Sequence, residues 1–278
     1  MTPVVIDAAG VNRTDCIAAE LFDFDGNPII GRTVESDGKR WYAKIAPQAV
    51  MADRDLLGYI LGVGAVNVAE IRRLENPAVV TLPDGSPWAA RGDHELLVRL
   101  GEDYVAGELP LRDLDEAVAY ELVFSLWIRR RDTHAGNKWY VDGLPLFFDH
   151  HAAFDDDHRN VEIGFFLHPE HSDEGHGGSW RLKPVGTGAK LDIRNVRREH
   201  RQTHRAVHYV NDVDRTIASM SNAASWIEAI TEETLRAAFH QAALQTDHAK
   251  SVHRMLLTTQ ATLGYDIERL REQLVRNP

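Results

Sequence analysis

Alternating polar and apolar positions dominate the first part of the chain. In residues 39–46 the alternation places Lys44 on one face of a strand and Trp41 on the other, as expected where one face is buried. Asp37-Gly38, just before this run, is a strong two-residue hairpin signal, and Asp25-Gly26-Asn27-Pro28 is a turn sequence. The pattern predicts a three-stranded antiparallel meander, with strands at 16–24, 29–35 and 39–46.

Helical spacing replaces this alternation after residue 50. Apolar residues recur on one face of a helix predicted at about 52–62, namely Leu56, Leu57, Ile60 and Leu61. Further short strands are expected at 66–72, 78–82 and 95–100. Residues 101–112 contain two glycines and a proline, and we expect them to connect a first part of the chain, 1–105, to a second part, 106–278.

The second part of the chain is mainly helical in pattern. Asp113 or Asp115 is expected to cap a helix that runs to about Arg130. Its predicted buried stripe is Val118, Leu122, Val123, Leu126 and Trp127. Residues 158–215 are rich in His, Arg and Gly and show no clear period. Three amphipathic helices are expected near 222–244, 247–260 and 265–276, with Thr231, Asp247 and Asp266 as capping or first-turn residues. Strands followed by helices predict an α+β fold.

Length and composition narrow the class of protein. The chain has 278 residues, 44% of them hydrophobic and 26% charged, which fits one large domain or two tightly joined lobes. Acidic residues outnumber basic ones by 42 to 31, and the net charge of −11 argues against non-specific binding to nucleic acids or membranes. A single cysteine, Cys16, excludes an internal disulfide framework. The sequence shows no membrane span and no secretory signal, so the expected compartment is the cytoplasm.

A hairpin with polar residues at its open end is the most informative feature. Asp142-Gly143 is a two-residue turn, and counting back along both arms sets Asn137 beside Phe148. Asp149 then lies next to Asn137, although 12 residues separate them in sequence. Asp132 lies in the loop that feeds the first arm. Three oxygen-bearing side chains are therefore expected to converge at one end of an otherwise apolar hairpin.

Converging Asn and Asp side chains suit phosphoryl transfer from ATP. Mg²⁺ is a hard cation that takes oxygen ligands, so Asn137 and Asp149 are the candidate metal ligands. Asp132 is the candidate base that orients the accepting hydroxyl and takes its proton. The transition state spreads negative charge over the phosphoryl oxygens, so a cation should also reach the phosphates. Lys44 is that candidate, and Asp55 in the following helix is its natural acidic partner.

These residues resemble the catalytic segment of a known group of kinases. The pattern Asp132-x-His134-x-x-Asn137, followed after a short hairpin by Asp149, is similar to that of the HipA-like and phosphatidylinositol 3-/4-kinase-like kinases. Upstream, residues 37–44 resemble the strand that carries the ATP lysine of the group, and residues 55–61 resemble the helix that carries its acidic partner.

The resemblance implies a bilobal protein-kinase-like fold that uses ATP and Mg²⁺. The N-lobe would be an antiparallel sheet with a helix at 1–105, and the C-lobe, at 106–278, would be mainly helical and hold the catalytic loop. His134 would lock that loop or take part in the chemistry. The implied acceptor is most often a protein Ser or Thr hydroxyl, with a small-molecule or lipid hydroxyl as the alternative.

Three features depart from the pattern of the group. Asp55 is one methylene shorter than the usual Glu, so a pair with Lys44 needs closer lobes or a bridging water. His150-His151 stand where many kinases have Phe-Gly, and only Gly26 and Gly31 flank the first turn in place of a Gly-rich phosphate loop. These departures favour an alternative hypothesis, a pseudokinase that keeps the fold as a nucleotide-binding or protein-interaction module.

Other signals have simpler interpretations. His168, His171 and His176 lack the spacing of a zinc site and indicate a polar loop. Basic residues cluster at 181–205, either as a solvated helix face or as a docking surface for an acidic substrate or partner. Residues 21–26 resemble the first motif of haloacid-dehalogenase-type phosphatases, and residues 149–151 resemble Asp-His-His phosphoesterases, but neither run sits in the α/β pattern that those enzymes need.

Overall fold

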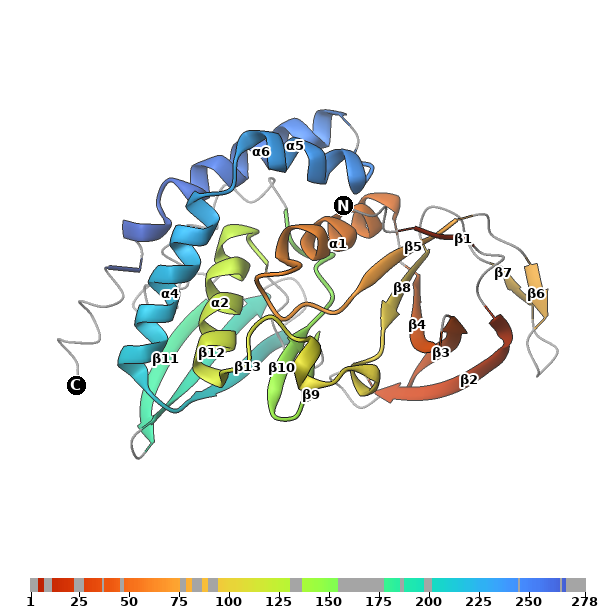
Figure 1. The fold of residues 1–278 in the computed structure, drawn as a ribbon, viewed down its shortest axis with the longest axis horizontal. Coiled ribbons are helices and arrows are strands. Elements are labelled where there is room, and N and C mark those ends of the chain that lie inside the picture. The colour runs from red at the N-terminus through yellow and green to blue at the C-terminus, as the bar shows by residue number, and fades with distance from the viewer. Residues whose placement is uncertain are drawn as a thin grey trace.

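A computed structural model shows mixed helix and sheet, with the strands and helices arranged as in Figure 1. The residues that the structure describes are 5–7, 12–22, 28–36, 38–45, 48–75, 79–81, 87–89, 95–130, 137–154, 178–185, 188–197, 202–244, 246–265 and 267–268.

A six-stranded sheet forms one end of the molecule, with the strand order β1-β5-β8-β4-β3-β2. Its strands are β1 (Val5–Asp7), β2 (Asn12–Phe22), β3 (Pro28–Ser36), β4 (Lys39–Ile45), β5 (Ile71–Glu75) and β8 (Glu95–Arg99). The pairs β2–β3 and β3–β4 are antiparallel, which confirms the predicted meander. Only the β1–β5 pair of this sheet is parallel among the described strands. A separate two-stranded ribbon, β6 (Val79–Thr81) and β7 (Pro87–Ala89), lies beyond it.

The helix α1 (Ala49–Gly62) follows β4 and confirms the helix predicted at 52–62. The strand predicted at 66–72 is displaced, because β5 begins only at Ile71. Residues 67–69 instead pair with the later hairpin: Ala69 N donates to the Phe147 carbonyl at 2.7 Å, and Phe147 N donates to the Asn67 carbonyl at 2.8 Å. The connection out of α1 therefore holds the hairpin against the sheet.

The predicted helix after residue 113 is α2 (Leu114–Trp127), and the side chain of Asp113 caps it by accepting a hydrogen bond from Glu116 N at 3.1 Å. Two short 3₁₀ turns, η3 (Gly101–Asp103) and η4 (Ala106–Glu108), precede it. The whole predicted stripe of α2 is buried, and so are Ala119, Phe124 and the polar residues Asp115, Glu121 and Ser125 of the same helix. The helix is thus enclosed on several sides, and the amphipathic prediction accounts for only part of its packing.

The hairpin has the predicted register. Strands β9 (Lys138–Val141) and β10 (Leu144–Phe147) are antiparallel, with Val141 opposite Leu144 and Lys138 opposite Phe147. Asp142 and Gly143 of the turn both have positive φ, 50° and 84°, as a type I′ turn requires. The open end of the hairpin therefore brings residue 137 beside residue 148.

The region 158–215, in which no period was predicted, contains a three-stranded antiparallel sheet. Its strands are β11 (Gly178–Val185), β12 (Gly188–Arg197) and β13 (Gln202–Val210). The helix-face interpretation of the basic cluster at 181–205 is therefore wrong, because the described basic residues there belong to strands. The register sets Lys183 opposite Lys190 and Arg194 opposite Arg205. The three histidines at 168–176 lie outside the described residues.

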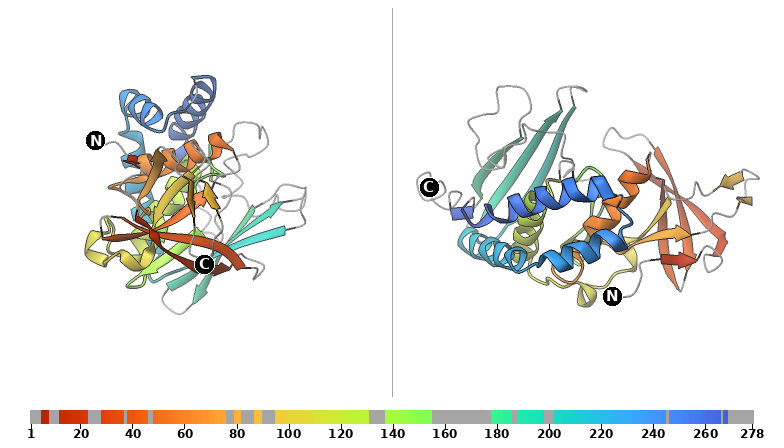
Figure 2. Two further views of the ribbon diagram at one scale, coloured as in Figure 1. Left: turned by 90° about the vertical axis from the view of Figure 1, so that its right-hand side faces the viewer. Right: turned by 90° about the horizontal axis from the view of Figure 1, so that it is seen from above.

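Three helices follow, and Figure 2 shows them running along one side of the molecule with the two larger sheets at opposite ends. They are α4 (Val213–Glu228), α5 (Glu232–Gln241) and α6 (Thr246–Gln260). The prediction of a single helix at 222–244 is wrong, because α4 ends at Glu228 and a new helix begins after Thr231. The Thr231 hydroxyl caps α5 by accepting a hydrogen bond from Thr234 N. Asp247 is in the first turn of α6 as expected. The helix predicted at 265–276, with Asp266, lies largely outside the described residues.

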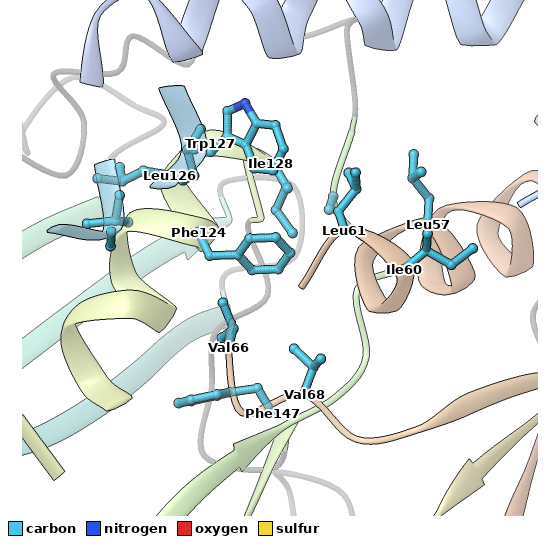
Figure 3. Close-up of a cluster of buried hydrophobic side chains, with 14 of the residues drawn as sticks. Leu57, Ile60, Leu61, Val66, Val68, Phe124, Leu126, Trp127, Ile128 and Phe147 are labelled. Carbon is cyan, nitrogen blue, oxygen red and sulfur yellow. The ribbon is translucent and has the colours of Figure 1, made fainter. Parts of the chain in front are cut away.

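One hydrophobic core joins these elements. Figure 3 shows the Phe124 ring of α2 lying between Leu61 of α1 and the pair Val66 and Val68. Phe124, Leu61 and Phe147 of the hairpin are all buried. Because the same core packs α1, α2 and β10, it fixes the position of α1 relative to the hairpin.

Candidate functional site

The ammonium group of Lys44 lies between two carboxylates. Lys44 Nζ is 2.5 Å from Asp55 Oδ2 and 2.6 Å from Asp149 Oδ1. Lys44 comes from β4 and Asp55 from the buried face of α1, and Asp149 lies two residues after the end of β10. Three of the residues singled out in the sequence are thus brought together, and the Asp55 side chain reaches Lys44 directly.

Asp55 also ties the helix to the end of the hairpin. Its second oxygen, Oδ1, accepts a hydrogen bond from the backbone N–H of His150 at 2.5 Å. The side chain is only 1% exposed, so both of its interactions are made away from water. One carboxylate therefore sets the positions of Lys44 and of the peptide that follows Asp149.

The charge states follow from this geometry. Burial of the ammonium group lowers the pKa of Lys44, but the carboxylates of Asp55 and Asp149 outweigh burial and hold that pKa above its usual value. Burial raises the pKa of Asp149, but Lys44 and His151 outweigh it and hold that pKa well below its usual value. Lys44 is therefore charged and Asp149 ionised at neutral pH.

Asp149 has further features that bear on metal binding. Its φ is 66°, in the left-handed region that non-glycine residues seldom occupy. The Nδ1 of His151 contacts Asp149 Oδ1 and lies 3.5 Å from Lys44 Nζ. Both neighbours use Oδ1, so among the described residues Oδ2 is left for a further ligand.

Asn137 lies at the open end of the hairpin, where the sequence places it. The backbone N–H of Phe148 donates to the Asn137 carbonyl at 3.2 Å, and the Phe148 ring stacks on Trp139 with centroids 3.9 Å apart. Asn137 is buried, at 5% exposure. The predicted pairing of residues 137 and 148 is confirmed, and Asp149 follows directly.

The candidate metal ligands are oxygen atoms. Mg²⁺ is usually held by one or two protein oxygens together with substrate phosphates and water. Asp149 has an ionised carboxylate and Asn137 an amide oxygen, and the same hairpin carries both residues, so these two would be the ligands if Mg²⁺ binds here. No group of three or more His, Cys, Asp or Glu that could hold a metal occurs within the described ranges.

The candidate base and its neighbouring histidine, Asp132 and His134, lie in residues 131–136, outside the described residues. Their roles stay predictions from the sequence. The residues that flank this segment are described, since Arg130 precedes it and Asn137 follows it.

His150 also belongs to the site, although in the sequence it stands out only because it replaces the Phe of the Phe-Gly pair found in many kinases. It is 1% exposed, and its ring meets that of Phe124 edge-on, with centroids 6.0 Å apart. A Cβ at position 58 of α1 would lie 2.4 Å from the Cβ of His150, so Gly58 is required for this approach. Among the residues that the structure describes, neither ring nitrogen has a hydrogen-bond partner. Burial holds the pKa of His150 well below its usual value, so the ring is neutral.

Comparison with known proteins adds little. No protein-family model matches the chain, and no curated protein matches it. Among solved structures, the chain is similar to a Helicobacter pylori proinflammatory kinase, CtkA, with a TM-score of 0.48 and 10% sequence identity over 96% of this chain and 99% of that one. A likeness at this level does not decide the activity. No helix of the described residues is long and apolar enough to cross a membrane.

Proposed function

We propose that the chain is an ATP- and Mg²⁺-dependent phosphotransferase of HipA-like type with a bilobal kinase-like fold, which transfers the γ-phosphate to a hydroxyl group, most often that of a protein Ser or Thr. The observation that carries the proposal is the position of Lys44 between Asp55 and Asp149, within 2.6 Å of both. The cation and the two carboxylates come from three separate elements. Removing these three charged groups from water has a high desolvation cost. Such an arrangement is typical of a site that handles charge.

Each residue has one role in the proposal. Lys44 donates to the α- and β-phosphates, and Asp55 holds Lys44 in place for that contact. Asn137 and Asp149 would hold Mg²⁺, which when bound neutralises part of the charge on the phosphates. Because Lys44 keeps its proton well above neutral pH, its positive charge is available at every physiological pH.

Asp132 is assigned the proton transfer. The acceptor hydroxyl loses its proton to the Asp132 carboxylate while its oxygen forms a bond to the γ-phosphorus. The bond from that phosphorus to the β–γ bridging oxygen breaks, and ADP leaves with the electron pair. His134, two residues further on, is assigned to orient this loop.

Transfer of radiolabelled γ-phosphate from ATP tests the proposal. Wild-type protein is incubated with a cell lysate, purified lipids or a mixture of metabolites in parallel, so that the acceptor class is identified by which fraction is labelled. The expected result is labelled protein with wild type and none with Asp132→Ala. Asp247→Ala, which removes a carboxylate that is 98% exposed on α6, is the matched control and should label as wild type does. Equal labelling by wild type and Asp132→Ala would remove the assigned base.

A second candidate function is supported by His151. Its ring nitrogen contacts the same Asp149 oxygen as Lys44, so only Oδ2 of the carboxylate assigned to Mg²⁺ is left for the ion among the described residues. This favours a pseudokinase that binds nucleotide without turnover. Thermal stabilisation by ATP with Mg²⁺, but no labelled phosphate in any fraction or on the protein, would support this alternative. Stabilisation by neither would contradict both functions.

A further inference from the structure

Arg130 is a buried cation beneath the open end of the hairpin. It lies three residues after the end of α2 and is only 1% exposed. Its Nη1 lies 3.2 Å from Glu121 Oε1, and its Nη2 donates to the Phe148 carbonyl at 2.7 Å and lies 3.5 Å from the Asn137 carbonyl. The guanidinium group thus joins helix α2 to both arms of the hairpin.

The acidic partner of Arg130 is itself anchored to the helix. Glu121 has a side chain 3% exposed, and Ser125, one turn later, donates its hydroxyl to Glu121 Oε1 at 2.9 Å. Burying such a pair costs as much desolvation energy as its attraction returns, and apolar residues of similar volume would hold a helix against a hairpin at least as well. What the pair supplies beyond apolar packing is a defined direction for each hydrogen bond.

Those directions act on the two candidate metal ligands. The Phe148 carbonyl belongs to the peptide that leads into Asp149, whose φ of 66° has to be held by its surroundings. The Asn137 carbonyl belongs to the residue whose amide side chain is assigned to the metal. Nη2 reaches both carbonyls while Nη1 is held by Glu121. The planar fork therefore fixes both peptides in a set direction from α2, which a single ammonium group cannot do.

We propose that Arg130, held by Glu121, is the positioning residue that sets Asn137 and Asp149 as a pair of metal ligands. The inference rests on the proposed function, because it takes Mg²⁺ as the ion that those two residues hold. Arg130 touches neither the ion nor the nucleotide. It acts through the two carbonyl groups. Removing a residue that positions a metal ligand by hydrogen bonding typically weakens metal binding by roughly 10- to 100-fold.

Mn²⁺ binding tests this role without requiring turnover. Electron paramagnetic resonance follows free Mn²⁺ as it is titrated into protein that carries a non-hydrolysable ATP analogue. For Arg130→Lys, which keeps the charge and loses the fork, we expect the Kd for Mn²⁺ to rise by at least about tenfold, while the Kd for the analogue without metal changes less than about twofold.

Arg99→Lys is the matched control. Arg99 is another buried arginine, paired with Glu108 and outside the candidate site, so the same substitution there should leave the Kd for Mn²⁺ within about twofold of wild type. If Arg130→Lys does not fold, Glu121→Gln, which is nearly isosteric, is measured instead, and it should weaken Mn²⁺ binding in the same direction. Unchanged Mn²⁺ affinity in the variant measured, or an equal loss in Arg99→Lys, would overturn the proposal.

The outcome is separable from that of the proposed function. Wild type that binds Mn²⁺ with the analogue but transfers no phosphate would end the kinase proposal, and the comparison with Arg130→Lys would still decide the positioning role. Wild type that transfers phosphate, with an Arg130→Lys variant of normal Mn²⁺ affinity, would leave the kinase proposal and end the positioning role.

Discussion

Lys44 and Asp149 form an ion pair of 2.6 Å although 105 residues separate them in sequence. The first comes from the third strand of the meander and the second from the end of the hairpin. Together with Asp55, these residues carry two negative charges and one positive charge. Such a group attracts a divalent cation and offers an ammonium group to phosphates.

Replacing Lys44 by Met should remove activity and stability together. Asp55 and Asp149 would then face each other in a buried site without a cation. Breaking one partner out of a buried ion pair costs roughly 3–5 kcal/mol, so urea unfolding should show a loss of about 3 kcal/mol, and phosphate transfer should fall below detection. Lys39→Met on the same strand is the control. Its pair with Glu70 spans 3.2 Å and its side chain is 34% exposed, so the loss should be under about 1 kcal/mol. Equal losses in the two variants would contradict the assignment.

Asp55→Asn separates the charge of Asp55 from its hydrogen bond. An amide oxygen can still accept from His150 N, but one of the two charges that hold Lys44 is gone. We expect phosphate transfer to fall by roughly 10- to 100-fold. The loss of stability should be smaller than in Lys44→Met, because Lys44 keeps Asp149 as a partner. Asp53→Asn, which weakens the 2.5 Å pair with Arg73 on the same helix, should lower stability and leave transfer near wild type. The reverse order of effects on transfer would show that Lys44 does not depend on Asp55.

His150 should make stability depend on pH. Its pKa in the folded protein is held well below the usual 6.5, chiefly by burial and then by Arg130, so the unfolded chain binds a proton more readily than the folded one. Stability from this group is therefore present above pH 6.5 and is lost as the pH falls, by up to about 1.4 kcal/mol per pH unit.

His150→Phe removes that dependence. An apolar ring fits beside Phe124 and leaves no unpaired nitrogen, so the variant should be at least as stable as wild type at pH 7.5. Urea unfolding at pH 7.5, 6.5 and 5.5 compares the two proteins, and the difference in slope isolates this residue from the other histidines. Parallel curves for the two proteins would show that His150 is charged or exposed when folded.

The sequence predicted the parts of the site that turn chemistry fixes. Asp142-Gly143 sets the hairpin register, and that register alone puts Asn137 beside Phe148 and next to Asp149. Lys44 follows from the alternation of β4. Asp55 was predicted as the partner of Lys44, but the sequence left open whether the contact is direct or bridged by water. The direct contact depends on how closely α1 packs, and at Gly58 that helix lies directly against His150.

Other parts of the fold were missed for identifiable reasons. The alternation Lys190-Leu191-Asp192-Ile193-Arg194 is that of a strand, but it was obscured by the His-, Arg- and Gly-rich residues around it, so β11, β12 and β13 were not predicted. Thr231 was recognised as a capping residue, yet the apolar period runs through it, and α4 and α5 were merged. The burial of Arg130 and Glu121 was missed because charged residues are seldom fully buried. Only their mutual pairing permits it.

The most direct test of the account is Mg²⁺-dependent transfer of labelled phosphate by wild type and Asp149→Ala. Both proteins are first compared by circular dichroism, which should show the same secondary structure. We expect transfer by wild type to rise with added Mg²⁺, and transfer by Asp149→Ala to stay below roughly one hundredth of that at every Mg²⁺ concentration. Transfer at the wild-type level by folded Asp149→Ala would show that this carboxylate does not hold the metal.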